Sequence, residues 1–230
     1  MIKENLASVE ERIRAACERA GRSRSDVTLV AVSKTNPVER IREAYDAGVR
    51  DFGENKVKEM LGKEPQLPED IRWHLIGHLQ TNKVKSVLGK TVLIHSIDSL
   101  KLLDTIDFES RKKGMVSEGL LEVNVAGEES KFGFLPEELI PLLDRLKQYR
   151  NLKIRGLMTV APFVEDAEEN RPVFRKLRQL SIDIKSKNID NVTMNVLSMG
   201  MTGDYEVAVE EGATLIRVGT GIFGMREIGE

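Results

Sequence analysis

The chain has 230 residues, of which 40% are hydrophobic and 31% are charged, and these proportions are typical of an ordinary globular protein and exclude a disordered one. Its formal net charge of -2 gives no overall attraction to nucleic acid or to an anionic membrane. A single cysteine, Cys17, excludes an intrachain disulfide, and no apolar segment has the length of a membrane span. The N-terminus lacks the apolar core of a signal peptide, so we expect a cytoplasmic protein.

The first predicted element is an amphipathic helix. Apolar residues recur at steps of three and four from Leu6 to Ala20, and Gly21 is a typical helix stop. The period then changes, because residues 27–33 form a short run rich in β-branched side chains, which is typical of a buried parallel strand. Asn36 follows this strand and is expected to cap the next helix.

The same strand, loop and helix unit recurs along the rest of the chain. Further strands are predicted near residues 51–53, 72–76, 92–96, 120–125, 153–159, 193–198 and 214–218. The clearest helices are predicted at residues 99–113, 136–149, 167–187 and 204–211. Eight strands that alternate with helices in a chain of this length predict a closed (β/α)8 TIM barrel with an additional N-terminal helix. Residues 1–230 are expected to form a single domain of this kind.

Lys34 is the first residue of chemical interest. The active face of such a barrel is formed by the C-terminal ends of the strands and the loops after them. Thr28, Val30, Val32 and Lys34 share one strand parity, so Lys34 ends an apolar row at the mouth of the barrel. Partial desolvation there favours a neutral, nucleophilic amine that can form a Schiff base. The alternative is a lysine that simply extends into solvent.

The end of the last predicted strand is rich in glycine. Arg217 is followed by Val-Gly-Thr-Gly-Ile-Phe-Gly, and backbone N–H groups exposed in such a turn bind anions. Barrels often hold a phosphate at the loops after strands 7 and 8, where Ser198, Gly200 and Thr220 lie. Glycines also serve tight turns, so this run alone does not decide the matter. Together with Lys34 it indicates a phosphorylated carbonyl compound, either pyridoxal phosphate or a sugar phosphate.

Further motifs are spread over the whole chain. They are AVSKT at 31–35, FGEN at 52–55, WHLIGHLQTNK at 73–83, HSID at 95–98, EVN at 122–124, KFGF at 131–134, GLMT at 156–159, LSMGM at 197–201 and RVG at 217–219. In this order they resemble the motifs of the pyridoxal phosphate homeostasis proteins, single-barrel relatives of the N-terminal domain of alanine racemase. The resemblance implies the same barrel and pyridoxal 5′-phosphate as the cofactor.

The resemblance also implies a role for six residues. They are Lys34 as the residue of the internal aldimine, Ser198, Gly219 and Thr220 as the phosphate ligands, Asn55 near the ring, and Arg217 at the pyridine nitrogen. Because an arginine stays protonated, it can only donate to that nitrogen, and the ring is then a poor electron sink. The alternative for Arg217 is a salt bridge at the rim, for example with Glu54.

The favoured function is that of a non-catalytic protein that stores and delivers pyridoxal 5′-phosphate in the cell and so affects the balance of amino acids and keto acids. A racemase needs a second base, which in alanine racemases is a tyrosine from a separate domain, and we expect no such domain here. Of the three tyrosines, only Tyr205 follows strand 7 and could approach the rim. A weak amino-acid racemase, a Schiff-base aldolase for sugar phosphates and a regulatory binding module remain as alternatives.

Other partners follow from the same observations. A metal is not expected, because Gly77 and the end of a strand break the helical spacing of His74 and His78. His74 is expected to be a hydrogen-bonded residue of the barrel. We expect a monomer and allow for transient contacts with apo-enzymes that need the cofactor. Whether Lys83 or Lys131 touches the cofactor during loading stays open.

Overall fold

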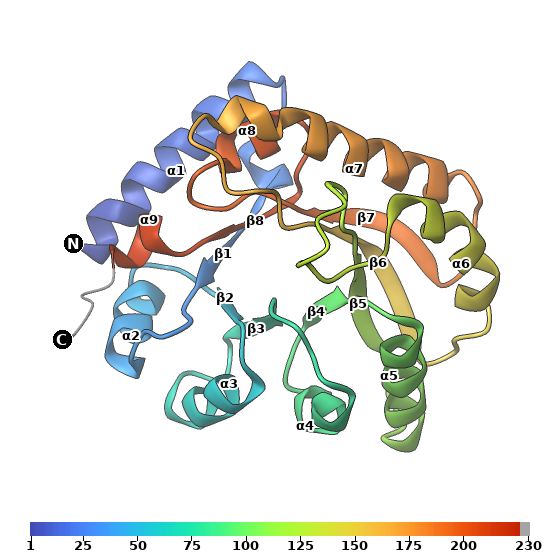
Figure 1. Cartoon of the computed structure of the whole chain (residues 1–230). Helices are drawn as coiled ribbons and strands as arrows, with labels where there is room; N and C mark the ends of the chain where they lie inside the picture. The colour runs from blue at the N-terminus through green and yellow to red at the C-terminus, as the bar shows by residue number, and fades with distance from the viewer. Residues whose placement is uncertain (226–230) are drawn as a thin grey trace.

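Eight parallel strands close into a barrel in the computed structural model, which describes residues 1–225 (Figure 1). The strands are β1 (Thr28–Val32), β2 (Asp51–Glu54), β3 (Arg72–Leu75), β4 (Leu93–Ile97), β5 (Ser117–Glu122), β6 (Leu152–Met158), β7 (Val192–Ser198) and β8 (Leu215–Val218). Each strand pairs with the next one along the chain, and β1 pairs with β8 to close the ring. The predicted (β/α)8 barrel is therefore confirmed.

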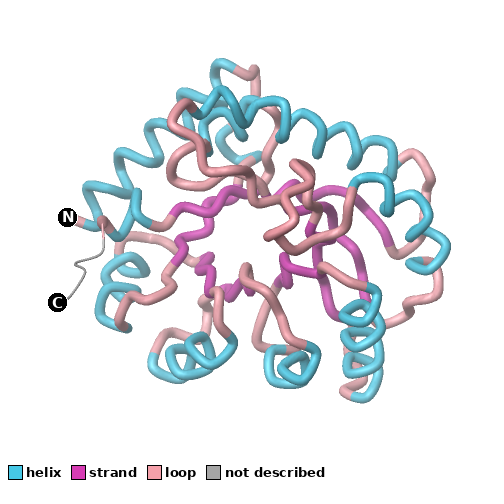
Figure 2. Tube along the Cα trace, in the orientation of Figure 1, coloured by secondary structure: helices cyan, strands magenta, loops and turns pink. Residues whose placement is uncertain are grey.

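Helices surround the strands on the outside of the barrel (Figure 2). They are α1 (Ile2–Arg19), α2 (Val38–Asp46), α3 (Val57–Lys63), α4 (Val84–Val87), α5 (Leu100–Lys112), α6 (Leu139–Leu146), α7 (Arg171–Lys185), α8 (Tyr205–Glu210) and α9 (Thr220–Phe223). Within residues 1–225, no helix combines the length and the apolar character that crossing a bilayer requires.

The additional N-terminal helix, α1, packs against α8, α9 and α2 on the outside of the barrel (Figure 1). Its buried residues repeat at helical spacing, and they are Ile2, Leu6, Val9, Ile13, Ala16 and Cys17. From its polar face, Arg12 and Arg19 reach the carboxylate of Glu206 in α8. Exposed ion pairs of this kind contribute little to stability, so the apolar stripe fixes the helix in place.

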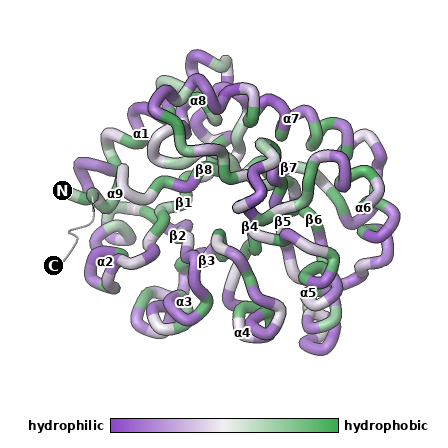
Figure 3. The backbone as a smooth tube through the Cα atoms, viewed as in Figure 1, coloured by the Kyte–Doolittle hydropathy of each residue, from purple (hydrophilic) through white to green (hydrophobic). Residues whose placement is uncertain are grey.

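Apolar residues pack on both sides of the strands. A small cluster fills the inside of the barrel, and its buried members are Val30, Leu93, Leu120, Met158 and Leu215. A much larger cluster fills the space between the outer faces of the strands and the helices. Hydrophobic and hydrophilic stretches alternate along the helices (Figure 3), as expected when one side of each helix covers the strands. Alternate strand residues therefore serve the two cores, as in other barrels.

The strand near residue 120 lies earlier in the chain than predicted. β5 begins at Ser117 and ends at Glu122, whereas the expected strand spans residues 120–125. Directly after the strand, the chain folds back, and the N–H of Phe134 donates to the carbonyl of Glu122 at 2.8 Å. Gly133 makes this approach possible at a φ of 114°, because a Cβ there would lie 2.9 Å from the backbone nitrogen of Asn124. The loop after β5 is thus tied to the end of its own strand.

The prediction that Asn36 caps α2 is wrong. The helix begins at Val38, and its N-cap residue is Pro37, which forms no side-chain hydrogen bond. The side-chain amide of Asn36 instead donates to the carbonyl of Lys34 at 3.2 Å. Asn36 therefore tightens the loop that carries Lys34 rather than the helix that follows.

Candidate functional site

A cavity of about 290 Å³ opens between the C-terminal ends of β1 and β8. It is lined by Val32, Lys34, Thr35, Asn36, Pro37, Arg40, Gly219, Thr220, Phe223, Gly224 and Met225. We call it the Lys34 cavity. Three residues of the predicted site, Lys34, Gly219 and Thr220, are therefore brought together although they are far apart in the sequence. Arg40 of α2 adds a cation that sequence reasoning missed, since nothing in a helical pattern marks it.

The loop that presents Lys34 is held by several hydrogen bonds. Thr35 has a φ of 64°, which is uncommon for a residue with a branched side chain, and its N–H donates to Glu59. The N–H of Asn36 donates to the carbonyl of Ser33 at 3.0 Å. Lys34, which is half-buried, thus projects from a tight turn at the end of β1. Because hydrogen bonds hold the backbone of this turn, the Lys34 side chain starts from a fixed position at the mouth of the barrel.

Below this turn lies a buried ion pair. Lys63 of α3 donates from Nζ to Glu54 at 2.8 Å, to Glu59 at 2.6 Å and to the carbonyl of Ser33 at 2.9 Å. The hydroxyl of Ser33 also donates to Glu54, at 2.6 Å. Burial raises the pKa of Glu54 even though Lys63 and Ser33 act against the shift. Glu54 is thus engaged with Lys63, and a salt bridge from Glu54 to Arg217 is not formed.

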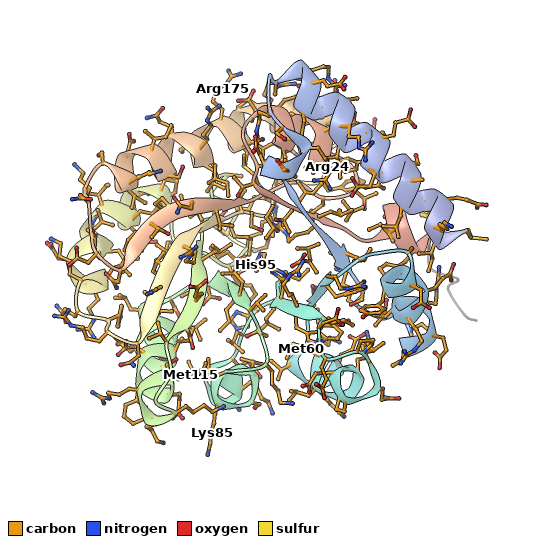
Figure 4. The ribbon with its side chains drawn as sticks, turned by 180° about the vertical axis from the view of Figure 1, so that it is seen from behind. Arg24, Met60, Lys85, His95, Met115 and Arg175 are labelled. Atoms are coloured by element: carbon orange, nitrogen blue, oxygen red, sulfur yellow. The ribbon has the colours of Figure 1, made fainter. Side chains whose placement is uncertain are left out.

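A chain of hydrogen bonds crosses the inside of the barrel beneath the mouth. Its members are Arg217 of β8, Ser198 of β7, His95 of β4, His74 and Arg72 of β3, and Asp51 of β2. We call this chain the interior relay. Figure 4 shows His95 inside the ring of strands, near its middle.

From Arg217 to Asp51, all donors of the interior relay point the same way, and Arg72 donates to Asp51 from the other end. The guanidinium of Arg217 donates to the hydroxyl of Ser198, so the proton of that hydroxyl points to Nδ1 of His95, which lies 2.9 Å away. His95 must then carry its own proton on Nε2, from which it donates to Nδ1 of His74 at 2.9 Å. His74 in turn donates from Nε2 to Asp51 at 3.0 Å. The expectation that His74 is a hydrogen-bonded barrel residue is therefore confirmed.

The charges of the interior relay are Arg217 at one end and the ion pair of Asp51 with Arg72 at the other. Burial lowers the pKa of Arg217 to about 10, so this residue stays cationic at neutral pH. Burial also lowers the pKa of His95 well below its usual range, and the nearby His74 and Arg217 act in the same sense. Burial alone would raise the pKa of Asp51, but hydrogen bonds from His74 and Arg72 lower it to about 2. A neutral His95 in the middle thus joins a cation to an anion.

The remaining predicted residues lie next to the Lys34 cavity but do not line it. The hydroxyl of Ser198 is engaged in the interior relay, and Arg217 also donates to the carbonyl of Thr159 at 2.8 Å. Asn55 is half-buried after β2, with the backbone of Gly77 packed closely against it. At the glycine turn, the hydroxyl of Thr202 accepts the N–H groups of Gly219 and Gly221 at 3.3 Å each. Sequence reasoning missed Thr202, because the loop after β7 has no regular pattern.

The sequence of this chain is similar to those of known proteins. Residues 5–227 match the family described as alanine racemase, N-terminal domain. The chain is 49% identical over 225 residues to the pyridoxal phosphate homeostasis protein of Aquifex aeolicus, covering 97% of this chain and 98% of the relative. It is 42% identical over 230 residues to the protein of the same name from Pseudomonas aeruginosa, covering 99% and 97% of the two chains.

Solved structures agree with this result. PipY of Synechococcus elongatus, in a structure with pyridoxal phosphate bound, superposes with a TM-score of 0.84 at 38% identity and covers 97% of this chain and 100% of its own. The alanine racemase of Clostridium difficile superposes with a TM-score of 0.75 at 13% identity, covering 98% of this chain and 57% of the racemase. The second likeness, at this low identity, concerns the fold alone.

Proposed function

The chain belongs to the alanine racemase N-terminal domain family, with pyridoxal phosphate homeostasis proteins among its relatives, and we propose that it holds pyridoxal 5′-phosphate at the mouth of its barrel. The observation that carries the proposal is the Lys34 cavity, because it gathers Lys34, Gly219 and Thr220 in one space of about 290 Å³. The PipY structure with bound pyridoxal phosphate supports it, since that chain shares the fold over nearly the full length.

The groups around the Lys34 cavity fit a phosphorylated aldehyde. Lys34 brings a primary amine, Arg40 a guanidinium group, and Thr220 a hydroxyl donor. The N–H groups of Gly219 and Gly221 donate to Thr202 only at 3.3 Å, which leaves them available for a stronger acceptor. When bound, pyridoxal 5′-phosphate supplies an aldehyde that reacts reversibly with amines and a ring that withdraws electrons. We propose Lys34 for the aldehyde, and Gly219 and Thr220 for the phosphate.

Two further residues of the proposed site, Arg217 and Asn55, act on the ring. We propose that Arg217 faces the pyridine nitrogen and that Asn55 lies near the ring. Ser198 stays a proposed phosphate ligand beside Gly219 and Thr220, and its hydroxyl also accepts a hydrogen bond from Arg217. A protonated Arg217 only donates, so it would not protonate the nitrogen, and electron withdrawal by the ring would stay weak. Weak electron withdrawal by the ring suits a protein that stores the cofactor better than it suits a fast catalyst.

The three tyrosines also favour a carrier over a racemase. The hydroxyl of Tyr45 donates to Asp70, and that of Tyr149 donates to Asp104, both on the outer side of the barrel. Tyr205 is 1% exposed and lies beneath α1. None of the three lines the Lys34 cavity, so no tyrosine of this chain is placed as a second base. We therefore propose storage and delivery of the cofactor, without turnover, as the function.

The absorption spectrum of the purified protein tests the binding site. We expect a yellow wild-type protein, borohydride reduction that fixes the cofactor on the peptide with Lys34, and a colourless Lys34→Ala variant. Lys147→Ala is the matched control, because Lys147 lies in an exposed ion pair with Asp144, and it should stay yellow. A wild-type protein that cannot be loaded, or a cofactor fixed on another lysine, contradicts the proposal.

Delivery needs its own measurement. We propose that the chain acts in the cytoplasm as a monomer and passes the cofactor to apo-enzymes in transient contacts. Loaded wild-type protein should restore the activity of a cofactor-dependent apo-enzyme faster than the same concentration of free cofactor, and Lys34→Ala should give no such advantage. Equal rates with free cofactor contradict delivery and leave storage as the function.

A further inference from the structure

A second cavity lies at the mouth of the barrel, at the C-terminal ends of β5 and β6. It has a volume of about 210 Å³ and is lined by Glu122, Val123, Asn124, Ser130, Lys131, Phe132 and Val160. We call it the Glu122 cavity. In a closed ring of eight strands, β5 lies across from β1, so the Glu122 cavity and the Lys34 cavity occupy opposite sides of one mouth.

Glu122 is the unusual member of this lining. The residue is only 9% exposed, and within residues 1–225 its carboxyl group accepts no side-chain or backbone hydrogen bond, although its oxygens keep some contact with solvent in the cavity. A buried carboxylate without a partner is costly, and such groups are found where a ligand completes them. The charges that face it are Asp98 after β4, which repels it, and Arg217 of β8, which attracts it. Glu122 is thus an acceptor that the fold leaves without a donor.

The loop after β5 gives the Glu122 cavity fixed walls. The side chain of Asn124 donates to the carbonyl of Glu128 at 2.8 Å and accepts the N–H of the same residue at 3.1 Å. Lys131 lies 2.6 Å from the carboxylate of Glu128 and donates to the carbonyl of Val160 at 3.3 Å. Lys131 therefore joins the loops after β5 and β6.

Two exposed apolar side chains form the outer wall. Phe132 is 56% exposed and Val160 is 36% exposed, although both lie beside a buried carboxyl group. The ring of Phe132 stacks on His78 with the centroids 4.0 Å apart, and His78 is fixed by Asp98 at 2.7 Å. The apolar wall is thus held in place, and it offers contact to a ligand rather than to the core.

We propose that the Glu122 cavity binds a primary ammonium compound with an apolar substituent, the ammonium group on Glu122 and the substituent against Phe132 and Val160. An anion would be repelled by Glu122, and a neutral alcohol would leave its charge unpaired. No group of three or more potential protein ligands is arranged for a metal ion in the part of the chain that the structure describes. Lys131 lies at the edge of the same cavity, where it would meet the carboxylate of an α-amino acid.

Calorimetric titration of the full chain, freed of any aldehyde with hydroxylamine, tests the proposal. We expect isobutylamine to bind at pH 8 at least tenfold more tightly than isobutanol or isobutyrate. Glu122→Gln should lose at least tenfold in affinity for the amine, and Phe132→Ala should also weaken it. Glu118→Gln is the matched control, because Glu118 lies in the same strand with an exposed side chain, and its affinity should equal that of the wild type. Equal binding of isobutanol, or an unchanged affinity in Glu122→Gln, overturns the proposal.

A spectroscopic measurement on the wild type does not depend on how the variants fold. In a chain labelled with ¹³C-glutamate, isobutylamine should shift the carboxyl signal of Glu122, and isobutanol should not. Binding should strengthen from pH 6 to pH 8, because burial and Asp98 raise the pKa of Glu122 to about 7 against the pull of Arg217. His78 and Lys131 are the other ionisable side chains beside the cavity. A Glu122 signal that does not respond to the amine overturns the proposal.

Leucine distinguishes the two sources of such a ligand. If leucine binds more tightly than isobutylamine and loses this advantage in Lys131→Met, the ligand is an α-amino acid. If isobutylamine binds more tightly, the ligand is a simple amine. If neither binds, the proposal is wrong. None of these titrations contains pyridoxal 5′-phosphate, so a failure of the proposed cofactor site would leave their results unchanged.

Discussion

Replacement of Glu122 by glutamine should stabilise the protein at neutral and alkaline pH. Burial and the nearby Asp98 raise the pKa of this carboxyl from 4.5 to about 7, although Arg217 opposes the change. At about 1.4 kcal/mol for each pH unit between the two values, the charged carboxylate costs the folded state about 3 kcal/mol above pH 7. Below pH 4.5 the group is protonated in both states, so the cost is absent there and grows as the pH rises towards 7. Glutamine carries no charge and removes this dependence.

Urea unfolding at several pH values measures the effect. Between pH 4 and pH 8, the free energy of unfolding of Glu122→Gln should improve by about 3 kcal/mol relative to that of the wild type. Glu118→Gln is the control, because Glu118 has an exposed side chain in the same strand. Its free energy of unfolding should stay within about 0.5 kcal/mol of the wild-type value at every pH. A Glu122→Gln difference that is the same at pH 4 and pH 8, or that moves in favour of the wild type, would refute the reasoning.

Three further changes test the supports of the site. Asp51→Asn should destabilise the protein by about 2 kcal/mol at pH 7, because the pKa of Asp51 falls from 3.8 to about 2 on folding. About half of this difference in the free energy of unfolding should vanish by pH 3, as measured by urea unfolding. A difference that is independent of pH contradicts this explanation. Lys63→Met should cost about 3–5 kcal/mol by leaving Glu54 charged and buried, and adding Glu54→Gln should recover much of it in thermal unfolding; no recovery contradicts the ion pair. Gly156→Ala should prevent stable folding, because a Cβ there would overlap a carbonyl oxygen of β7, while Gly203→Ala, with open space around it, should melt close to the wild type; similar melting of both variants contradicts the close approach.

Hydrophobic periodicity was sufficient to predict the barrel, because each strand and helix buries residues according to a local rule. The predicted alternation of eight strands with helices corresponds to β1–β8 with their outer helices. Boundaries were less predictable. β5 ends at Glu122 rather than at residue 125. The reason is that the chain folds back, and the N–H of Phe134, twelve residues later, donates to the carbonyl of Glu122. No pattern within the strand itself reports such a contact.

The site was predictable where backbone position decides it and unpredictable where side chains meet across the barrel. Lys34 and Thr220 converge because each directly follows a barrel strand or its turn. The bond between His95 and Ser198 joins residues 103 positions apart, and it depends on which side chains share one level of the interior. Glu122 was quoted as part of a motif without a role, since its lack of a hydrogen-bond partner appears only when its surroundings are known.

The apolar cluster inside the barrel affects how a small molecule can enter and leave. Val30, Leu93, Leu120, Met158 and Leu215 are each at most 7% exposed, so packed side chains fill the barrel below its mouth. A small molecule must therefore leave through the opening by which it entered. Binding and release then use the same mouth of the barrel. A second molecule can bind only after the first has left, or beside it on the opposite side of the mouth.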